Sequence, residues 1–206
     1  MTRRRIGMVA ALLLSAVFAR PTLALEATPF AGPMIPTKAL VLLTNGGAFI
    51  RMQSHTVYGF ALGSELSPRL GLEAVLGVGT GKLELVGGGE NLIMGSTMYM
   101  ADVRANVRLA GSDGARLGLL LGGGYTDVET GIFDLADETD AGTFQGRLTG
   151  VAGLGMRGRL SDRLHARVEV VDRIHLQGAK LEDTTAFAEK TQNDIVATLG
   201  LMIVIH

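Results

Sequence analysis

Residues 97–109 read Thr-Met-Tyr-Met-Ala-Asp-Val-Arg-Ala-Asn-Val-Arg-Leu, and this stretch decides the fold. Its odd positions from Tyr99 to Leu109 are all apolar, whereas its even positions from Asp102 to Arg108 are all polar or charged. Successive side chains of a β-strand point to opposite faces, so a strand here has one apolar face and one charged face. The same alternation recurs along the chain as far as Ile205 and predicts an all-β protein.

The first 24 residues have the layout of a secretory signal peptide. A basic head of three arginines is followed by an apolar run, Ile6–Phe18, and by the small-residue exit Thr22-Leu23-Ala24. The run of 13 residues is too short to span a bilayer as a helix. We therefore expect cleavage after residue 24, with residues 25–206 forming one domain.

The composition narrows the class of protein. The chain has no cysteine, so it offers neither disulfides nor thiolate metal ligands. Its net charge of −1 and its lack of a basic block argue against nucleic-acid binding. The mean hydropathy of +0.32 is high for a chain without an apolar segment long enough for a transmembrane helix. A membrane barrel displays such apolar surface, whereas a soluble domain must hide it.

Turns and loops divide the chain into eight expected strands. Short turns at 67–69, 111–114 and 161–163 alternate with long connections at 36–55, 83–95, 128–144 and 177–192. A membrane tolerates only closed β structure, and an even strand number with short and long connections at opposite ends is typical of outer-membrane barrels. The predicted fold is an eight-stranded antiparallel transmembrane β-barrel, preceded by a cleavable signal peptide, with its short turns and termini in the periplasm.

Three places depart from this regular pattern. Residues 27–35 contain Pro29 and Pro33, which lack the N–H that a ladder needs, so they make a poor first strand. Residues 38–52 surround an Asn-Gly pair and form either a hairpin that extends a loop or two additional barrel strands. Asp172 falls on the apolar face, which indicates a bulge or the edge of the bilayer.

The faces opposite the apolar ones carry the candidate functional residues. An eight-stranded barrel is only wide enough for its own side chains, and buried charges must pair. We expect a structural ion-pair network that plugs the lumen, with pairs reaching across the barrel between the strands of Arg104 and Glu169. A narrow ion-filtering pore is the alternative, and it would prefer anions because arginines outnumber acids. The predicted lumen residues are Glu65, Glu73, Asp102, Arg104, Asn106, Arg108, Arg147, Arg157, Arg159, Arg167 and Glu169.

Catalytic and metal sites are not indicated. Ser54 and His55 are adjacent, and adjacent side chains of a strand point to opposite faces, so they form no dyad. His175 lies near the expected outer rim without a recognisable partner. The acidic loop at residues 134–140 does not match the spacing of an EF-hand. We expect no enzymatic activity, no cofactor and no metal ion.

The chain resembles the small eight-stranded outer-membrane β-barrel family, which is related to the transmembrane domain of outer membrane protein A. The resemblance rests on the turn and strand at 159–170, on Gly122-Gly123-Gly124-Tyr125 and on a closing strand that begins Asn193-Asp194. It implies an outer-membrane location in a Gram-negative-type bacterium, a monomer, and contact with membrane lipids, periplasmic chaperones and the barrel-insertion machinery. Unlike the family pattern, the chain closes on Ile205-His206 rather than on an aromatic residue.

The resulting functional hypothesis is a non-enzymatic envelope protein with a structural, surface-contact or minor permeability role. A lipid A-modifying barrel enzyme is the first alternative, and it needs a nucleophile and a base within hydrogen-bond reach at the outer rim. A soluble lipocalin-like carrier is the second, and it has the same strand number with an apolar interior. The face that holds the charges distinguishes the carrier from both membrane barrels.

Overall fold

The computed structural model describes residues 25–38, 41–42, 49–87, 90–112, 114–130, 144–176 and 192–205. The expected signal peptide, the acidic loop at 134–140 and most of the connections at 128–144 and 177–192 lie outside these residues. The described part consists of strands β1 (Leu25–Pro36), β2 (Val41–Leu42), β3 (Phe49–Met52), β4 (His55–Ser67), β5 (Leu70–Gly87), β6 (Glu90–Gly111), β7 (Ala115–Thr130), β8 (Phe144–Arg159), β9 (Leu164–His175) and β10 (Gln192–Ile205).

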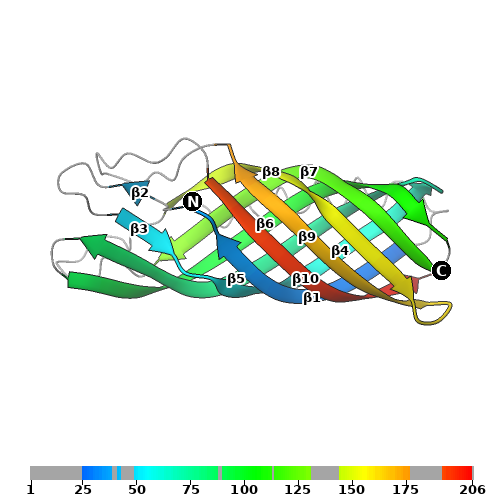
Figure 1. Ribbon diagram of the computed structural model, residues 1–206, viewed down its shortest axis with the longest axis horizontal. Coiled ribbons are helices and arrows are strands. Elements are labelled where there is room, and N and C mark those ends of the chain that lie inside the picture. Colours follow the sequence, from blue (N-terminus) through cyan, green and yellow to red (C-terminus); the bar gives the residue numbers. More distant parts are fainter. Residues whose placement is uncertain are drawn as a thin grey trace.

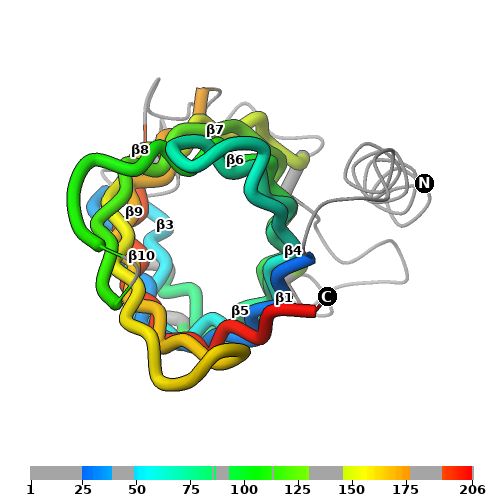
Figure 2. The backbone as a smooth tube through the Cα atoms, turned by 90° about the vertical axis from the view of Figure 1, so that its right-hand side faces the viewer, coloured from blue at the N-terminus to red at the C-terminus, as the bar shows by residue number. Residues whose placement is uncertain are grey.

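Eight of the strands close into a barrel, as the sequence predicted (Figure 2). Their order around the ring is β1, β4, β5, β6, β7, β8, β9 and β10, and β1 closes the ring by pairing with β10. Every neighbouring pair is antiparallel. Closure satisfies the backbone N–H and C=O groups that an open sheet would leave exposed at its edges, and a bilayer permits no such edges.

The barrel wall has its apolar face outside and its charged face inside, which is the reverse of a soluble barrel. Large apolar side chains are exposed on the outside, with Val168 at 43% and Leu201 at 42%, whereas Asp102 on the inside is 1% exposed. The described residues contain no helix that is long and apolar enough to cross a membrane. An outer apolar surface around a charged interior fits a barrel in lipid and argues against a soluble carrier of apolar ligands. Other exposed members of the belt include Leu76, Leu121, Leu154, Val170, Leu199 and Ile203.

The two ends of the barrel differ in the length of their connections (Figure 1). At one end Leu25 pairs with Ile205, and the short turns join β4 to β5, β6 to β7 and β8 to β9. Gly111 in the β6–β7 turn has a φ of +109°, which a residue with a Cβ rarely adopts. At the other end, the gaps from β1 to β4, from β7 to β8 and from β9 to β10 are long, as expected, whereas only residues 88–89 separate β5 from β6.

The barrel wall continues beyond its long-loop end as a β extension, shown at the left of Figure 1. The prediction of an irregular connection at 83–95 was wrong, because β5 and β6 stay paired from the wall as far as Gly87 and Glu90. The hairpin of β2 and β3 adds to the same sheet, with Met52 opposite Leu83. Residues 38–52 thus contribute a hairpin beyond the barrel and no extra barrel strands. Of the glycines in 83–95, Gly87 and Gly95 lie within the β5–β6 ladder.

An ion pair fastens β3 to β5 in this extension. The Arg51 guanidinium lies 2.9 Å from the Glu84 carboxylate, and Gln53 also donates to that carboxylate. Hydrogen bonds from Arg51 and Gln53 hold the pKa of Glu84 below its usual value. The carboxylate is therefore ionised at neutral pH, and the extension is tied together by more than its backbone ladder.

The irregular positions noted in the sequence have local explanations. β1 is a complete barrel strand, and its ladder to β10 lacks the pairs at residues 28–29 and 32–33, beside Pro29 and Pro33. Of the two explanations for Asp172, a bulge or the edge of the bilayer, the bulge is wrong, since β9 keeps its register with both neighbours through this residue. Asn193 on β10 donates to Asp172 at 3.2 Å.

The face assignment predicts that Val168→Arg and Leu201→Arg each destabilise the barrel by about 2–4 kcal/mol, because an arginine would enter the hydrocarbon core. The measurement is urea unfolding in lipid vesicles followed by circular dichroism, since the chain has no tryptophan to serve as a fluorescent probe. Ser161→Arg, in an exposed turn, is the control and should be neutral. Neutral behaviour of both belt variants would contradict the assignment.

Candidate functional site: the barrel interior

Four charged side chains meet in the middle of the barrel, and we call Glu73, Arg104, Arg167 and Glu169 the charge ring. Arg104 lies 3.1 Å from Glu169 and 3.6 Å from Glu73. Arg167 lies 2.6 Å from Glu73 and also pairs with Glu169. All four residues are buried. Each arginine thus contacts both carboxylates, and the ring is electrically neutral.

Strand register explains how the ring assembles. Glu73 on β5 and Arg104 on β6 are directly opposite in the ladder, so both point inward at the same level. Arg167 and Glu169 are two residues apart on β9 and therefore share a face. Four steps around the barrel separate β5 from β9, which makes them opposite walls. The ring is consequently a bridge across the lumen.

A second group lies nearer the short-turn end. Arg157 lies 2.8 Å from Glu26 and pairs with Glu65, and Arg116 lies 2.5 Å from the same Glu65 oxygen. Arg108 differs from these, because its guanidinium donates to the carbonyl oxygen of Gly111 at 2.6 Å. This group surrounds a pocket of about 600 Å³, counting the part open to solvent.

A third group lies toward the long-loop end. Arg173 on β9 pairs with Asp102 on β6 and donates to the Thr126 hydroxyl at 3.0 Å. Arg147 on β8 donates to the side-chain oxygen of Gln192 on β10. Arg173 and Asp102 are among the most buried residues in the barrel, at 2% and 1% exposed. Cross-barrel pairing of charges therefore extends along the lumen beyond the charge ring.

A hydroxyl, an imidazole and a carboxylate form a chain beside this third group. Nε2 of His175 lies 2.5 Å from Asp194 Oδ2, and Nδ1 of His175 lies 3.3 Å from the Thr149 hydroxyl. The Thr149 hydroxyl is also 3.0 Å from that of Thr126. A nucleophile, base and orienting acid are connected in the same way in hydrolases. Here Thr149 is 2% and His175 0% exposed, so this chain is covered by other side chains.

The lumen residues expected from the sequence are thus distributed over three groups. The charge ring holds four of them, Glu65 and Arg157 lie at the short-turn end, and Asp102 and Arg147 lie at the other. Arg159, by contrast, is exposed and pairs with Asp162 in the β8–β9 turn. Asn106 lines the pocket near the short turns, as Arg108 does.

Several members of the network were missed by the sequence reasoning. Arg116 and Arg173 lie on the inward parity of their strands, so the alternation itself could have identified them. Arg173 was missed because it follows Asp172, where a bulge or the edge of the bilayer was expected to end the regular pattern. Glu26 belongs to the strand that seemed weak because of its prolines. His175 lies opposite Gln192 and Asp194 lies opposite Arg173, so His175 and Asp194 are diagonal neighbours on one face, which only the register reveals.

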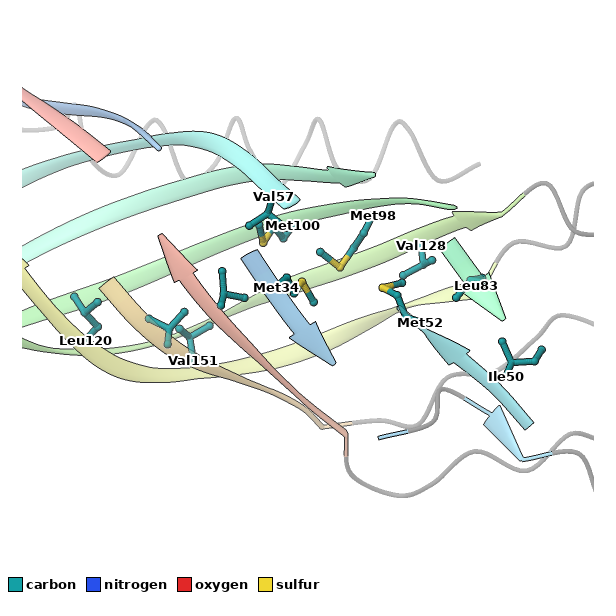
Figure 3. Packing of buried hydrophobic residues seen from close by; sticks show 12 residues of the cluster. Met34, Ile50, Met52, Val57, Leu83, Met98, Met100, Leu120, Val128 and Val151 are labelled. Atoms are coloured by element: carbon teal, nitrogen blue, oxygen red, sulfur yellow. The ribbon is translucent and has the colours of Figure 1, made fainter. Parts of the chain in front are cut away.

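Apolar side chains extend along the lumen from the level of the charge ring, where Leu120 lies near Glu169, to the β extension, where Ile50 and Leu83 lie. Figure 3 shows them directed into the same interior space, with methionines prominent among them. Met98 and Met100 share the inward face of β6 with Asp102, so this face changes from charged to apolar along the strand. The cluster consists of Met34, Ile50, Met52, Val57, Leu83, Met98, Met100, Leu120, Val128, Val151, Val171 and Val196.

Comparison with known proteins identifies the architecture. No family model matches the chain, and no curated protein sequence matches it. Among solved structures, neisserial surface protein A has a TM-score of 0.57 at 8% identity, over 89% of this chain and 97% of that protein. A major outer membrane protein of Thermus thermophilus has a TM-score of 0.58 at 12% identity, over 89% and 100%.

Ail, the attachment invasion locus protein of Yersinia pestis, was solved in complex with the heparin analogue sucrose octasulfate. It has a TM-score of 0.51 at 11% identity, over 88% of this chain and 99% of that one. The chain therefore has the fold of the small eight-stranded outer-membrane β-barrels, as its resemblance to that family implied. It is a transmembrane barrel of the type found in Gram-negative outer membranes.

The charge ring predicts a large cost for removing one of its members. Glu169→Ala leaves two buried arginines to share one carboxylate and should destabilise the barrel by about 3–5 kcal/mol. Replacing Arg104 with Met in the same protein restores the charge balance and should recover much of that loss. Urea unfolding followed by circular dichroism measures both effects.

The matched control for this prediction is the exposed pair of Arg159 and Asp162. Asp162→Ala should cost less than about 1 kcal/mol, because water screens an exposed ion pair. Equal effects of Glu169→Ala and Asp162→Ala would show that the ring is hydrated and contradict a desolvated network.

Proposed function

We propose that the protein is a non-enzymatic outer-membrane barrel that carries a β-structured surface for contacts outside the cell. Its closed lumen makes it a scaffold, and its β extension is the surface it presents. The observation that carries this proposal is the bridging of opposite walls by the charge ring, since a lumen crossed by ion pairs leaves little room for a conducted solute.

The filling of the lumen on the long-loop side of the ring supports the same proposal. The Arg173–Asp102 pair and the apolar cluster occupy that side, whereas a pocket lined by Arg157 and Arg116 lies on the short-turn side. The balanced charge of the ring removes the reason for an anion preference. Minor permeability would therefore need movement of the bridging side chains, and a sustained open pore is not favoured.

The β extension supports the surface role. On the side of β6 away from β5, pairing with β7 begins at Ser96, so residues 90–95 form a strand edge within the described part of the chain. Ile93 in this segment is 53% exposed. An exposed strand edge can pair with an added strand from another chain. Contact of this kind would use the backbone and would need few specific side chains.

One observation favours the second candidate, a barrel enzyme that modifies envelope lipids. The linked Thr149, His175 and Asp194 have the connectivity of a nucleophile, base and acid. Their burial counts against catalysis, because a substrate could reach the Thr149 hydroxyl only after the side chains at the long-loop end of the lumen rearrange. We therefore assign them a structural role, in which the hydrogen bonds satisfy buried polar groups.

The scaffold proposal predicts that the wild-type barrel gives no stable ion-conducting steps in planar lipid bilayers. Glu169→Ala should produce conductance events, because it removes one end of the bridge. Asp162→Ala, at the exposed turn, should leave the bilayer silent. Stable wild-type conductance would show that the lumen is open and would overturn the closed-scaffold proposal.

Experiments on intact cells distinguish the surface-contact function from the enzymatic one. An epitope inserted between β5 and β6 should be labelled without lysis, because the extension continues from the long-loop end. Lipid A from cells expressing the wild type and His175→Ala should have the same mass spectrum. A lipid modification that depends on His175 would establish the enzymatic function instead. Labelling only after lysis would show that the β extension faces the periplasm.

A further inference from the structure

We propose that the methionine-rich end of the lumen, around His55, binds a soft monovalent metal ion such as Cu(I) or Ag(I). The proposed ligands are the His55 imidazole and the thioethers of Met34 and Met98. This inference does not depend on the surface role proposed above, because it concerns the inside of the wall and not the extension.

The tautomer of His55 is the starting point. Nδ1 lies 3.0 Å from the backbone carbonyl oxygen of Gln53. A carbonyl oxygen only accepts, so Nδ1 carries the hydrogen and Nε2 keeps a free lone pair in the neutral ring. Metal-binding histidines are typically held in this way, with the second nitrogen donating to a backbone carbonyl.

The lone pair of His55 is buried and has no hydrogen-bond partner. His55 is 8% exposed, and its Nε2 is one of the few buried side-chain nitrogens without a partner among the described residues. A buried acceptor without a donor costs free energy, so its persistence calls for a reason. The side chain beside the ring is Val57, and the buried Ser96 on β6 lies at the same level of the sheet, opposite Gly81.

Strand register places two methionines on the inward face near His55. Met34 on β1 is directly opposite His55 on β4, and both point inward. The imidazole lies against Gly79, where a Cβ would be 2.8 Å from Nε2, and Gly79 is directly opposite Met98 on β6. Met34 and Met98 are 0% and 1% exposed, and Figure 3 shows both directed into the lumen.

The chemistry of these donors selects the ion. Thioether sulfur and imidazole nitrogen are the ligands that Cu(I) and Ag(I) favour, whereas Ca²⁺ and Mg²⁺ require oxygen. No group of three or more His, Asp or Glu side chains that could hold a metal occurs within the described residues. A single positive charge among neutral, polarisable sulfur atoms also suits an apolar interior better than a divalent ion does.

The test is titration of the folded barrel in detergent micelles with silver nitrate, using Ag(I) because it is redox-stable. We expect one ion per barrel, with affinity reduced about tenfold or more in both His55→Ala and Met98→Leu. Leucine conserves the volume of methionine, so Met98→Leu keeps the packing. His165→Ala, near the short turns, and Met156→Leu, on the lipid face, are the controls and should bind as the wild type does.

A second measurement uses the wild type alone and so does not depend on variant folding. With ¹³C-methyl-labelled methionine, Ag(I) should shift the methyl signals of Met34 and Met98 and leave those of Met156 and Met202 unchanged. Absence of stoichiometric binding would overturn the proposal. Equal binding by the wild type, His55→Ala and Met98→Leu, or uniform shifts of all methionine methyls, would overturn it as well.

Discussion

Two arginines and two glutamates meet as buried side chains in the middle of the barrel, and the rest of the architecture must keep them together. Desolvating each ion costs several kcal/mol, and opposite charges offset that cost. Glu73 pairs with Arg104 on the neighbouring strand and Arg167 pairs with Glu169 on its own strand, but the two pairs reach each other only if the sheet closes. Closure therefore gives each arginine a second carboxylate, and a barrel that fails to close loses these contacts across the lumen.

The same constraint orders the lumen along its axis. Charges occupy the levels where opposite walls can pair them, and methionine and valine occupy the level toward the β extension. Methionine suits this position because its flexible thioether fills irregular space between strands. The site inferred around His55 lies within this apolar level, where a neutral ring and thioethers replace the ion pairs found elsewhere. The same narrow lumen can therefore be closed by ion pairs at one level and hold a soft metal ion at another.

Sequence alone was sufficient for the wall and insufficient for the pairings inside it. The alternation around Asp102 and Arg104 predicted which side chains point inward, because parity is a local property of a strand. Which residues meet across the lumen depends on the register of every strand between them. No single segment of the sequence determines that register. Arg173 and Glu26 were missed because the bulge or bilayer edge expected at Asp172 and two prolines obscured their strands. Residues 83–95 were expected to be a long connection, although β5 and β6 pair as far as Gly87 and Glu90.

The most direct test of the central claim is a double-mutant cycle between Glu73 and Arg167, which lie on opposite walls of the barrel. Urea unfolding of the wild type, Glu73→Gln, Arg167→Met and the double variant gives their coupling free energy. A bridge across the lumen predicts a favourable coupling of about 1–3 kcal/mol, with the double variant more stable than the sum of the single losses allows. A coupling within about 0.5 kcal/mol of zero would mean that the two residues act independently, and it would contradict a lumen closed by paired charges.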